Sequence, residues 1–348
     1  MKFINLESFG QLPPNQELSG NSYSSNTFKA LLKEYGASII SDLYTNSSIS
    51  SVQNSSMNVY GVTRSGLVMT SNAAAIGFVI SLPDVKQAAL QLGFRYTLSE
   101  GAKYNSDPRH ISIGGYSFTT PYPTEAASYY YELFAAWDGS RVNAELFCNG
   151  SSVGKQTFTV SDTTNINVII GQSSNYIFQS GVTGKVMLGD IYLAEIPYVE
   201  NVATAAPFGS VEVKYSKVVG FNGGNADNSI TDDIVSGLNG AGTADGFLLL
   251  GADEEAAVAT FENIDNTDGK LLGAVAGVVY RSSVTTKNYL AWGLSCGEDA
   301  AEIQEDKKVY QDQSSWTTVR RTLMKGDKLG GTGLTFKASL YNRKNLSK

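Results

Sequence analysis

The chain has 348 residues, of which 42% are hydrophobic and 17% charged, and its formal net charge is −7. This length predicts about two domains, and the excess of acidic residues disfavours binding to nucleic acid, which needs clustered lysine and arginine. The two cysteines are too few for a disulfide framework, and 35 glycines with 19 tyrosines indicate strands and turns rather than long helices.

We interpret the N-terminal region as an extended arm, with a frayed terminus as the alternative. Residues 1–27 show no sustained hydrophobic periodicity and contain Pro13-Pro14, and one short helix is expected after them, at Phe28–Tyr35. No apolar segment like that of a signal peptide lies near the N-terminus, and the longest mostly apolar stretch, Ala73–Leu82, is about half the length of a membrane span. The sequence therefore predicts a protein made in the cytoplasm, without a signal peptide or transmembrane segment.

A first β-sandwich domain is expected at 28–197. Asn149-Gly150 gives its strongest turn signal, because both central residues of a type I′ hairpin turn need positive φ. One helix is expected at Pro83–Leu92, where the apolar residues fit one helical face. The predicted strands are Met57–Val62, Leu67–Thr70, Tyr129–Trp137, Val142–Cys148, Gln156–Val160, Ile166–Ile170 and Val186–Ile196.

A linker at 198–209 and a second β-sandwich domain at 210–348 follow. The linker is poorly periodic and contains Pro207, and the domain behind it repeats the pattern of short strands and Gly-rich loops. The predicted strands are Val211–Val219, Phe247–Leu250, Ala257–Phe261, Leu271–Tyr280, Tyr289–Cys296, Trp316–Leu323 and Leu334–Leu340.

Three short matches occur in the same order in the two halves, which indicates a duplicated unit of about 150 residues. Each match is only a few residues long, so chance similarity stays an alternative. The first match is Gly77–Ile80 with Gly246–Leu249, and the second is Leu146–Cys148 with Leu294–Cys296. The third has two parts: Thr183-Gly184 matches Thr332-Gly333, and Ile191-Tyr192 matches Leu340-Tyr341.

Two patches carry a resemblance to a known family. Trp137–Val142 followed by Leu146–Gly154 looks like a central hairpin, and Gly189–Leu193 looks like a closing strand, as does Ser339–Arg343. Together they resemble the concanavalin A-like jelly roll, including laminin-G-like domains. The second half departs from the pattern, because Cys296 lacks a following Asn-Gly. The resemblance implies two tandem all-β sandwiches, and members of this superfamily bind glycans, cleave glycans or serve as structural modules, so fold alone does not decide the function.

The sequence offers no set of catalytic residues. The paired carboxylates of jelly-roll glucanases, in a Glu-x-Asp-x-x-Glu pattern, are absent. Glu145 lies on a predicted strand, where it could face a concave sheet; the alternative is a residue of a solvated sheet face. His110 is the only histidine, so every scheme with a serine or cysteine nucleophile would need it. Cys148 and Cys296 lack the spacing of zinc ligands and are interpreted as small core residues.

Acidic and aromatic groups are the candidates for binding sites. Asn263–Gly269 is rich in oxygen ligands but lacks EF-hand spacing and is interpreted as a turn. On a strand, Tyr129 and Tyr131 share one face and Tyr130 takes the other, so one ring could face outward and stack on a glycan; the alternative is a tyrosine half-buried on a sheet face. We interpret the acidic groups Asp232-Asp233 and Asp253–Glu255 as parts of solvated loops. The three tryptophans, Trp137, Trp292 and Trp316, are interpreted as core residues. No catalytic, cofactor-binding or metal-binding residue is assigned.

The leading hypothesis is a non-enzymatic structural protein of a tailed-bacteriophage virion, in a capsid decoration, collar or tail. It is based on tandem all-β domains, low charge and the N-terminal arm. Expected partners are other virion proteins, with further copies of itself and surface glycans as additional candidates, and neither nucleic acid nor membrane. The alternatives are a carbohydrate-binding, lectin-like module of a fibre or adhesin and, second, a glycoside hydrolase.

Overall fold

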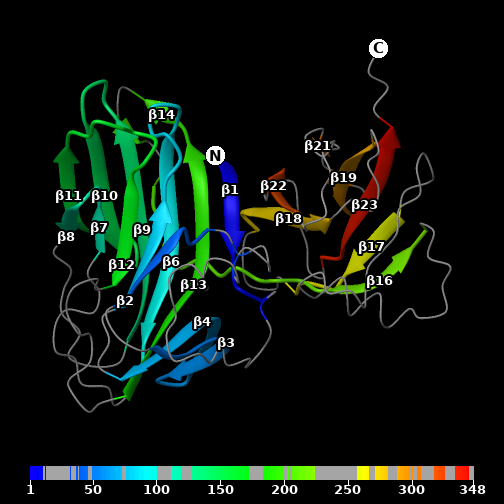
Figure 1. The fold of residues 1–348 in the computed structure, drawn as a ribbon, viewed down its shortest axis with the longest axis horizontal. Helices are drawn as coiled ribbons and strands as arrows, with labels where there is room; N and C mark the ends of the chain where they lie inside the picture. Colours follow the sequence, from blue (N-terminus) through cyan, green and yellow to red (C-terminus); the bar gives the residue numbers. More distant parts are fainter. Residues whose placement is uncertain are drawn as a thin grey trace. The chain divides into compact units, whose positions relative to one another are not determined.

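The computed structural model describes about three fifths of the chain, and the fold is given for these residues (Figure 1). They are 1–10, 12, 32, 37, 39–45, 49–72, 76–99, 111–118, 127–171, 183–199, 202–203, 206–223, 257–265, 271–280, 288–297, 299–300, 304–306, 317–325 and 334–344. Their regular elements are strands, which confirms the prediction of an all-β protein. Within these ranges, no helix is long and apolar enough to cross a membrane.

The chain divides into two compact units, each described separately below. Unit 1 comprises Met1–Lys33 with Ala37–Lys214, and unit 2 comprises Glu34–Gly36 with Tyr215–Lys348. Unit 1 thus includes the whole of the segment 198–209, where a linker is expected from the sequence.

The larger sheet of unit 1 is antiparallel and has the strand order β11-β10-β9-β6-β13-β4-β3. The long strand β13 lies between β6 and β4, and β1 pairs with its C-terminal half, beyond the end of β4. The strands are β1 (Lys2–Glu7), β3 (Ile49–Val59), β4 (Val62–Asn72), β6 (Ala89–Leu98), β9 (Ala127–Trp137), β10 (Val142–Cys148), β11 (Ser151–Phe158) and β13 (Thr183–Ile196).

The second sheet of unit 1 completes a β-sandwich and has the order β2-β5-β12-β7-β8. Its strands are β2 (Asp42–Thr45), β5 (Ile76–Ser81), β7 (Ile111–Ile113), β8 (Tyr116–Phe118) and β12 (Asn167–Gly171), and a small ribbon pairs β14 (Tyr198–Val199) with β15 (Val202–Ala203).

Because side chains alternate along a strand, successive residues of each strand in the larger sheet point to opposite faces. The buried set Leu90, Leu92, Phe94, Tyr96 and Leu98 therefore shares one face of β6.

The helix expected at Pro83–Leu92 is absent, and that prediction is wrong. The Gln87 N–H donates to the Asp84 carbonyl at 3.0 Å in a turn, and β6 begins at Ala89. All ten residues of β6 are buried. From Leu90 to Leu98, apolar residues alternate with Gln91, Gly93, Arg95 and Thr97, which is the period of a strand, so the helical spacing across the preceding turn arises by coincidence. Of the helix expected at Phe28–Tyr35, only Leu32 is among the described residues, and it is helical and buried.

The hairpin that carries the family resemblance forms as predicted. Strand β10 has the predicted bounds, and Asn149 and Gly150 have φ of 48° and 82°, as a type I′ turn requires. Of the arm expected at 1–27, residues Lys2–Glu7 form β1 within the sheet of unit 1.

Unit 2 is built on a six-stranded antiparallel sheet with the order β16-β17-β23-β19-β20, in which β21 also pairs with β19. A separate pair joins β18 to β22. Leu290, Trp292, Leu294, Phe336 and Ala338 form its core. The strands are β16 (Val218–Asn222), β17 (Ala257–Phe261), β18 (Gly273–Tyr280), β19 (Asn288–Cys296), β20 (Asp299–Ala300), β21 (Gln304–Asp306), β22 (Thr317–Lys325) and β23 (Phe336–Lys344).

The second half differs from its predictions in two places, and a third prediction is untested. Of the strand expected at Val211–Val219, only Val218 and Val219 belong to a strand, β16. The strand expected at Phe247–Leu250 lies outside the described residues. The strands of the matched cysteines also have different neighbours: β10, which ends at Cys148, pairs with β9 and β11, whereas β19, which ends at Cys296, pairs with the closing strand β23.

Candidate functional site

A buried polar cluster lies on the face of the larger sheet opposite Leu90 and Leu92. Neighbouring strands supply it in register: Gly93 of β6 pairs with Glu132 of β9 on one side and with Tyr192 of β13 on the other. Charged side chains are rarely fully buried unless they are paired. The cluster consists of Gln91, Arg95, Glu132, Asp190 and Tyr192, each at most 6% exposed.

A β-bulge directs Asp190 into the cluster. The register of β13 with β6 shifts between Gly189 and Tyr192, and Asp190 has φ of 48°. Bulges re-aim side chains, and non-glycine residues with positive φ persist where surrounding contacts hold them. Here the Tyr130 hydroxyl donates to the Asp190 carbonyl at 3.2 Å.

Glu132 is the centre of the first half of the cluster. The Tyr192 hydroxyl donates to its Oε1 at 2.6 Å, and Gln91 Nε2 donates to the same oxygen at 3.1 Å. Gln91 Nε2 is also 2.7 Å from the Tyr192 hydroxyl oxygen. These bonds fix the carboxylate on the sheet face.

The protein's own backbone covers this face. The segment Phe208–Val213, here called the strap, crosses the cluster without joining a ladder. Both oxygens of Glu132 accept strap N–H groups: Phe208 N is 2.8 Å from Oε1 and Gly209 N is 2.9 Å from Oε2. The Phe208 ring packs on Tyr192, with centroids 5.7 Å apart.

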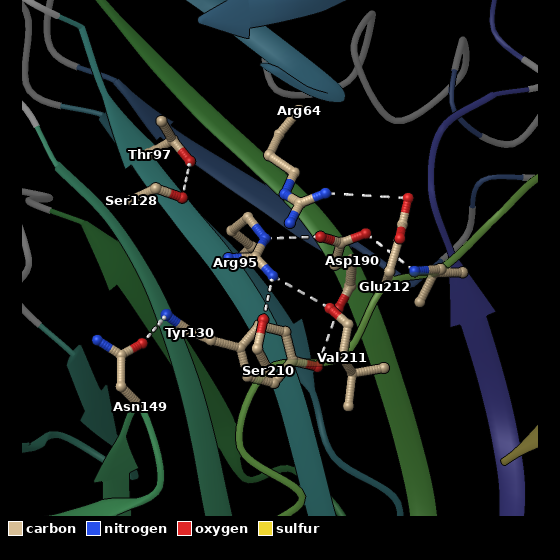
Figure 2. Close-up of polar contacts among 11 residues, drawn as sticks. Arg64, Arg95, Thr97, Ser128, Tyr130, Asn149, Asp190, Ser210, Val211 and Glu212 are labelled. Carbon is tan, nitrogen blue, oxygen red and sulfur yellow. Dashed lines mark hydrogen bonds and ion pairs between the residues drawn. The ribbon is translucent and has the colours of Figure 1, made fainter. Parts of the chain in front are cut away.

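Arg95 and Asp190 hold the rest of the strap (Figure 2). Arg95 Nε donates to Asp190 Oδ2 at 2.7 Å, and its Nη2 donates to Ser210 Oγ at 2.7 Å and to the Val211 carbonyl at 3.2 Å. Asp190 Oδ1 accepts the Val213 N–H at 2.9 Å. The buried ion pair therefore recognises both the N–H and the C=O groups of an extended backbone.

Burial shifts the acid–base behaviour of the cluster. It raises the pKa of the Asp190 carboxyl, although hydrogen bonds from Arg95 and the Val213 N–H act in the opposite direction. Burial and the neighbouring Glu132 charge raise the pKa of both Tyr130 and Tyr192. The two phenols therefore stay neutral and remain hydrogen-bond donors.

Glu145, the one catalytic candidate from the sequence, lies outside this cluster. It pairs in register with Phe134, so it is on the same sheet face as Glu132 but one strand further out. Ser152 Oγ donates to its Oε1 at 2.7 Å, and Lys155 Nζ is 3.4 Å from its Oε2. Its oxygens are engaged by surface partners.

The predicted aromatic and cysteine positions divide between core and surface. Tyr130, Tyr131 and Trp292 are buried, and Cys296 is in the core of unit 2. Tyr129, Trp137 and Cys148 are half-buried, and Lys86 Nζ lies 4.9 Å above the Trp137 ring.

The remaining candidates lie mainly outside the described residues. These are His110, Asp232-Asp233, Asp253–Glu255 and Trp316. Of Asn263–Gly269, only 263–265 are described, and there Ile264 forms a bridge with Leu334. Within the described ranges, no group of three His, Cys, Asp or Glu side chains is placed to hold a metal ion.

Arg95, Glu132 and Asp190 are functional candidates that the sequence patterns do not single out. The available signal is one charged residue within an otherwise apolar or aromatic strand, as Glu132 is within Tyr129–Trp137. On a strand that is buried on both faces, such a charge needs a partner, which predicts a paired polar site.

Comparisons with known proteins yield distant structural likenesses. No protein-family model matches the chain, and no curated protein matches it. Among solved structures, it is similar to a sialidase, with 10% identity and a TM-score of 0.26 over 40% of this chain and 17% of that one. It is also similar to the CBM22-1-CBM22-2 tandem domain of Paenibacillus barcinonensis Xyn10C, with 8% identity and a TM-score of 0.25 over 97% and 91% of the two proteins. A third is the catalytic domain of a glycoside hydrolase family 131 protein from Coprinopsis cinerea, with 12% identity and a TM-score of 0.25 over 40% and 74%.

Proposed function

We propose that the protein is a non-enzymatic structural protein that acts through protein–protein contacts. The observation that supports it is the occupied sheet face: both Glu132 oxygens bind N–H groups of the strap. A glycosidase needs two carboxylates that reach its substrate. Glu132 is covered and Glu145 is bound to Ser152 and Lys155, so the geometry favours recognition of a polypeptide over hydrolysis.

The virion of a tailed bacteriophage is the proposed setting, with a role in capsid decoration, a collar or a tail. Tandem all-β units, low charge and Ser/Asn/Gly/Tyr-rich composition support it. Removal of residues 1–20 is a poor test of this role, because it would delete β1 and its pairing with β13.

The direct test is sedimentation of the native protein. A lysate of the source is centrifuged, and the protein is identified by mass spectrometry in each fraction. Co-sedimentation with megadalton particles is the expected result, and recovery only as a free species would contradict the proposal.

A carbohydrate-binding function is the second candidate, favoured by one aromatic platform. Tyr116 is 45% exposed and stacks on Phe158, with ring centroids 4.7 Å apart and an interplanar angle of 19°. A ring that is supported from below presents its other face to a sugar. A glycan panel would show binding that Tyr116→Ala abolishes and that Tyr60→Ala, at another exposed tyrosine, leaves intact.

A further inference from the structure

The strap is bound as a peptide ligand is bound. Along five of its six residues, the cluster engages a backbone N–H, a backbone C=O or a small hydroxyl, through charge-assisted hydrogen bonds of 2.7–3.2 Å. The sixth residue, Glu212, has an oxygen 4.0 Å from Arg64 Nη1. Such contacts require an extended segment with a suitable sequence, but they do not require that it belong to the same molecule.

Three features give the site its sequence preference. Gly209 has φ of 85°, which favours glycine at that position. The Phe208 ring packs on Tyr192, and Ser210 supplies the hydroxyl for Arg95. The segment that fits is therefore Phe-Gly-Ser-Val-Glu-Val, as it stands in this protein.

We propose that this sheet face is a peptide-binding site that also takes the strap of a second copy of the protein, so that neighbouring copies exchange straps. The inference rests on the proposed structural function, in which many copies lie close together. It names the partner, a second copy, and the segment of that copy which binds.

The second copy is the occupant that the contacts favour. Every copy carries both the site and the one segment shown to satisfy it, so an exchanged strap makes the same hydrogen bonds as a resident one. The strap also ends at the boundary of unit 1, which extends to Lys214, so the strands of unit 1 need not be broken. In an assembly, neighbours raise the effective concentration of straps, which favours exchange.

Two complementary variants of the full-length protein test this proposal. Glu132→Gln disables the site, because the amide nitrogen cannot accept the Gly209 N–H, but it keeps a normal strap. Gly209→Pro disables the strap but keeps a normal site. Proline has no N–H for Glu132, and it fixes φ at about −65°, whereas Gly209 has φ of 85°. Each variant alone is expected at the monomer mass of 37.2 kDa by light scattering, and an equimolar mixture at twice that mass.

The control is a mixture of Gly209→Pro with Glu145→Gln in place of the Glu132→Gln variant. Glu145 is on the same sheet face, but its oxygens bind Ser152 and Lys155 instead of the strap. Its strap stays in its own site, so its mixture with Gly209→Pro is expected to contain much less dimer. A mixture of the two primary variants that remains at the monomer mass overturns the proposal.

A peptide assay keeps the test informative when a variant is damaged. Fluorescent peptide 206–213 is expected to bind Gly209→Pro at least about tenfold more tightly than Glu132→Gln, since charge-assisted bonds are lost in the latter. Circular dichroism checks that both are folded, and Gly209→Ala and Asp190→Asn serve as milder replacements. Equal peptide binding by both variants also overturns the proposal. Particle sedimentation is a separate measurement and tests only the proposed structural function. If straps are not exchanged, the structural function is unaffected. If straps are exchanged but the wild-type protein is recovered only as a free species, the structural function alone is contradicted.

Discussion

The ring of Tyr192 lies directly across Gly93, its partner in register on β6. A Cβ atom on Gly93 would be 2.0 Å from Tyr192 Cε1, so only glycine allows the ring to lie there. This crossing takes the Tyr192 hydroxyl to Glu132 on the next strand, 2.6 Å from Oε1. Because Gly93 has no side chain, Tyr192 of β13 can cross β6 and bind Glu132 of β9, which in turn binds the strap.

Gly93→Ala is expected to displace Tyr192 and lower the free energy of unfolding by about 1–3 kcal/mol, the usual cost of overpacking. Urea unfolding followed by fluorescence measures it. Gly220→Ala is the matched control, because a Cβ at that strand position meets nothing within 4 Å. Equal stability of the two variants would show that the ring moves away without cost.

The buried pair of Arg95 and Asp190 predicts a large effect on stability. Their side chains are each 7% exposed, and Arg95→Ala would leave the Asp190 carboxylate without its cation. Loss of one partner of a buried pair costs about 3–5 kcal/mol. Calorimetry of the unit 1 transition provides the measurement.

Lys155→Ala is the comparison for Arg95→Ala, since Lys155 also pairs with an acidic residue but is 74% exposed. Exposed pairs contribute less than about 1 kcal/mol, so this variant should unfold almost like the parent. Comparable losses in both variants would show that burial does not strengthen the pair of Arg95 and Asp190.

Local chemistry explains what could be predicted from the sequence. The Asn149-Gly150 turn and the bounds of β10 follow from turn residues and alternation over a few positions. The sequence before β6 is misleading because Val85, Ala88 and Leu92 have helical spacing across a turn, whereas the alternation that marks the strand becomes clear only from Leu90 to Leu98.

The polar cluster could not be assembled from the sequence, because its members are far apart along it. Gln91 and Tyr192 are 101 residues apart, and Phe208 is 76 residues from Glu132. Alternation predicts the second half of the strap as part of the strand Val211–Val219. The strap N–H groups bind carboxylates instead of a neighbouring strand, and only the folded sheet reveals that.

Glu132→Gln is expected to loosen the strap and expose it to proteases. Each charge-assisted bond to a strap N–H contributes about 1.5–3 kcal/mol, so losing even one should raise the open population at least about tenfold. Limited proteolysis by chymotrypsin at Phe208, already 37% exposed, should accelerate by a similar factor. Glu145→Gln should be cut at the parental rate, and an unchanged rate in Glu132→Gln would mean that other contacts hold the strap.

The turn after β9 predicts an unusually acidic carboxyl at Asp138. The N–H groups of Ser140 and Arg141 and the side-chain amide of Asn143 donate to it, which lowers its pKa from 3.8 to about 2. The folded state therefore binds this proton less tightly than the unfolded state. The contribution of Asp138 to stability is complete above the unfolded value and is lost as the pH falls toward 2.

Carbon-detected NMR of the aspartate carboxyls should give a titration midpoint near 2 for Asp138. In Asp138→Asn, the side chain keeps an acceptor oxygen for the turn but has no proton to bind in this range. The variant should therefore lose this part of the acid dependence of unfolding. A midpoint near the ordinary value of 3.8 would mean that the turn opens in solution and that its donors do not hold the carboxylate.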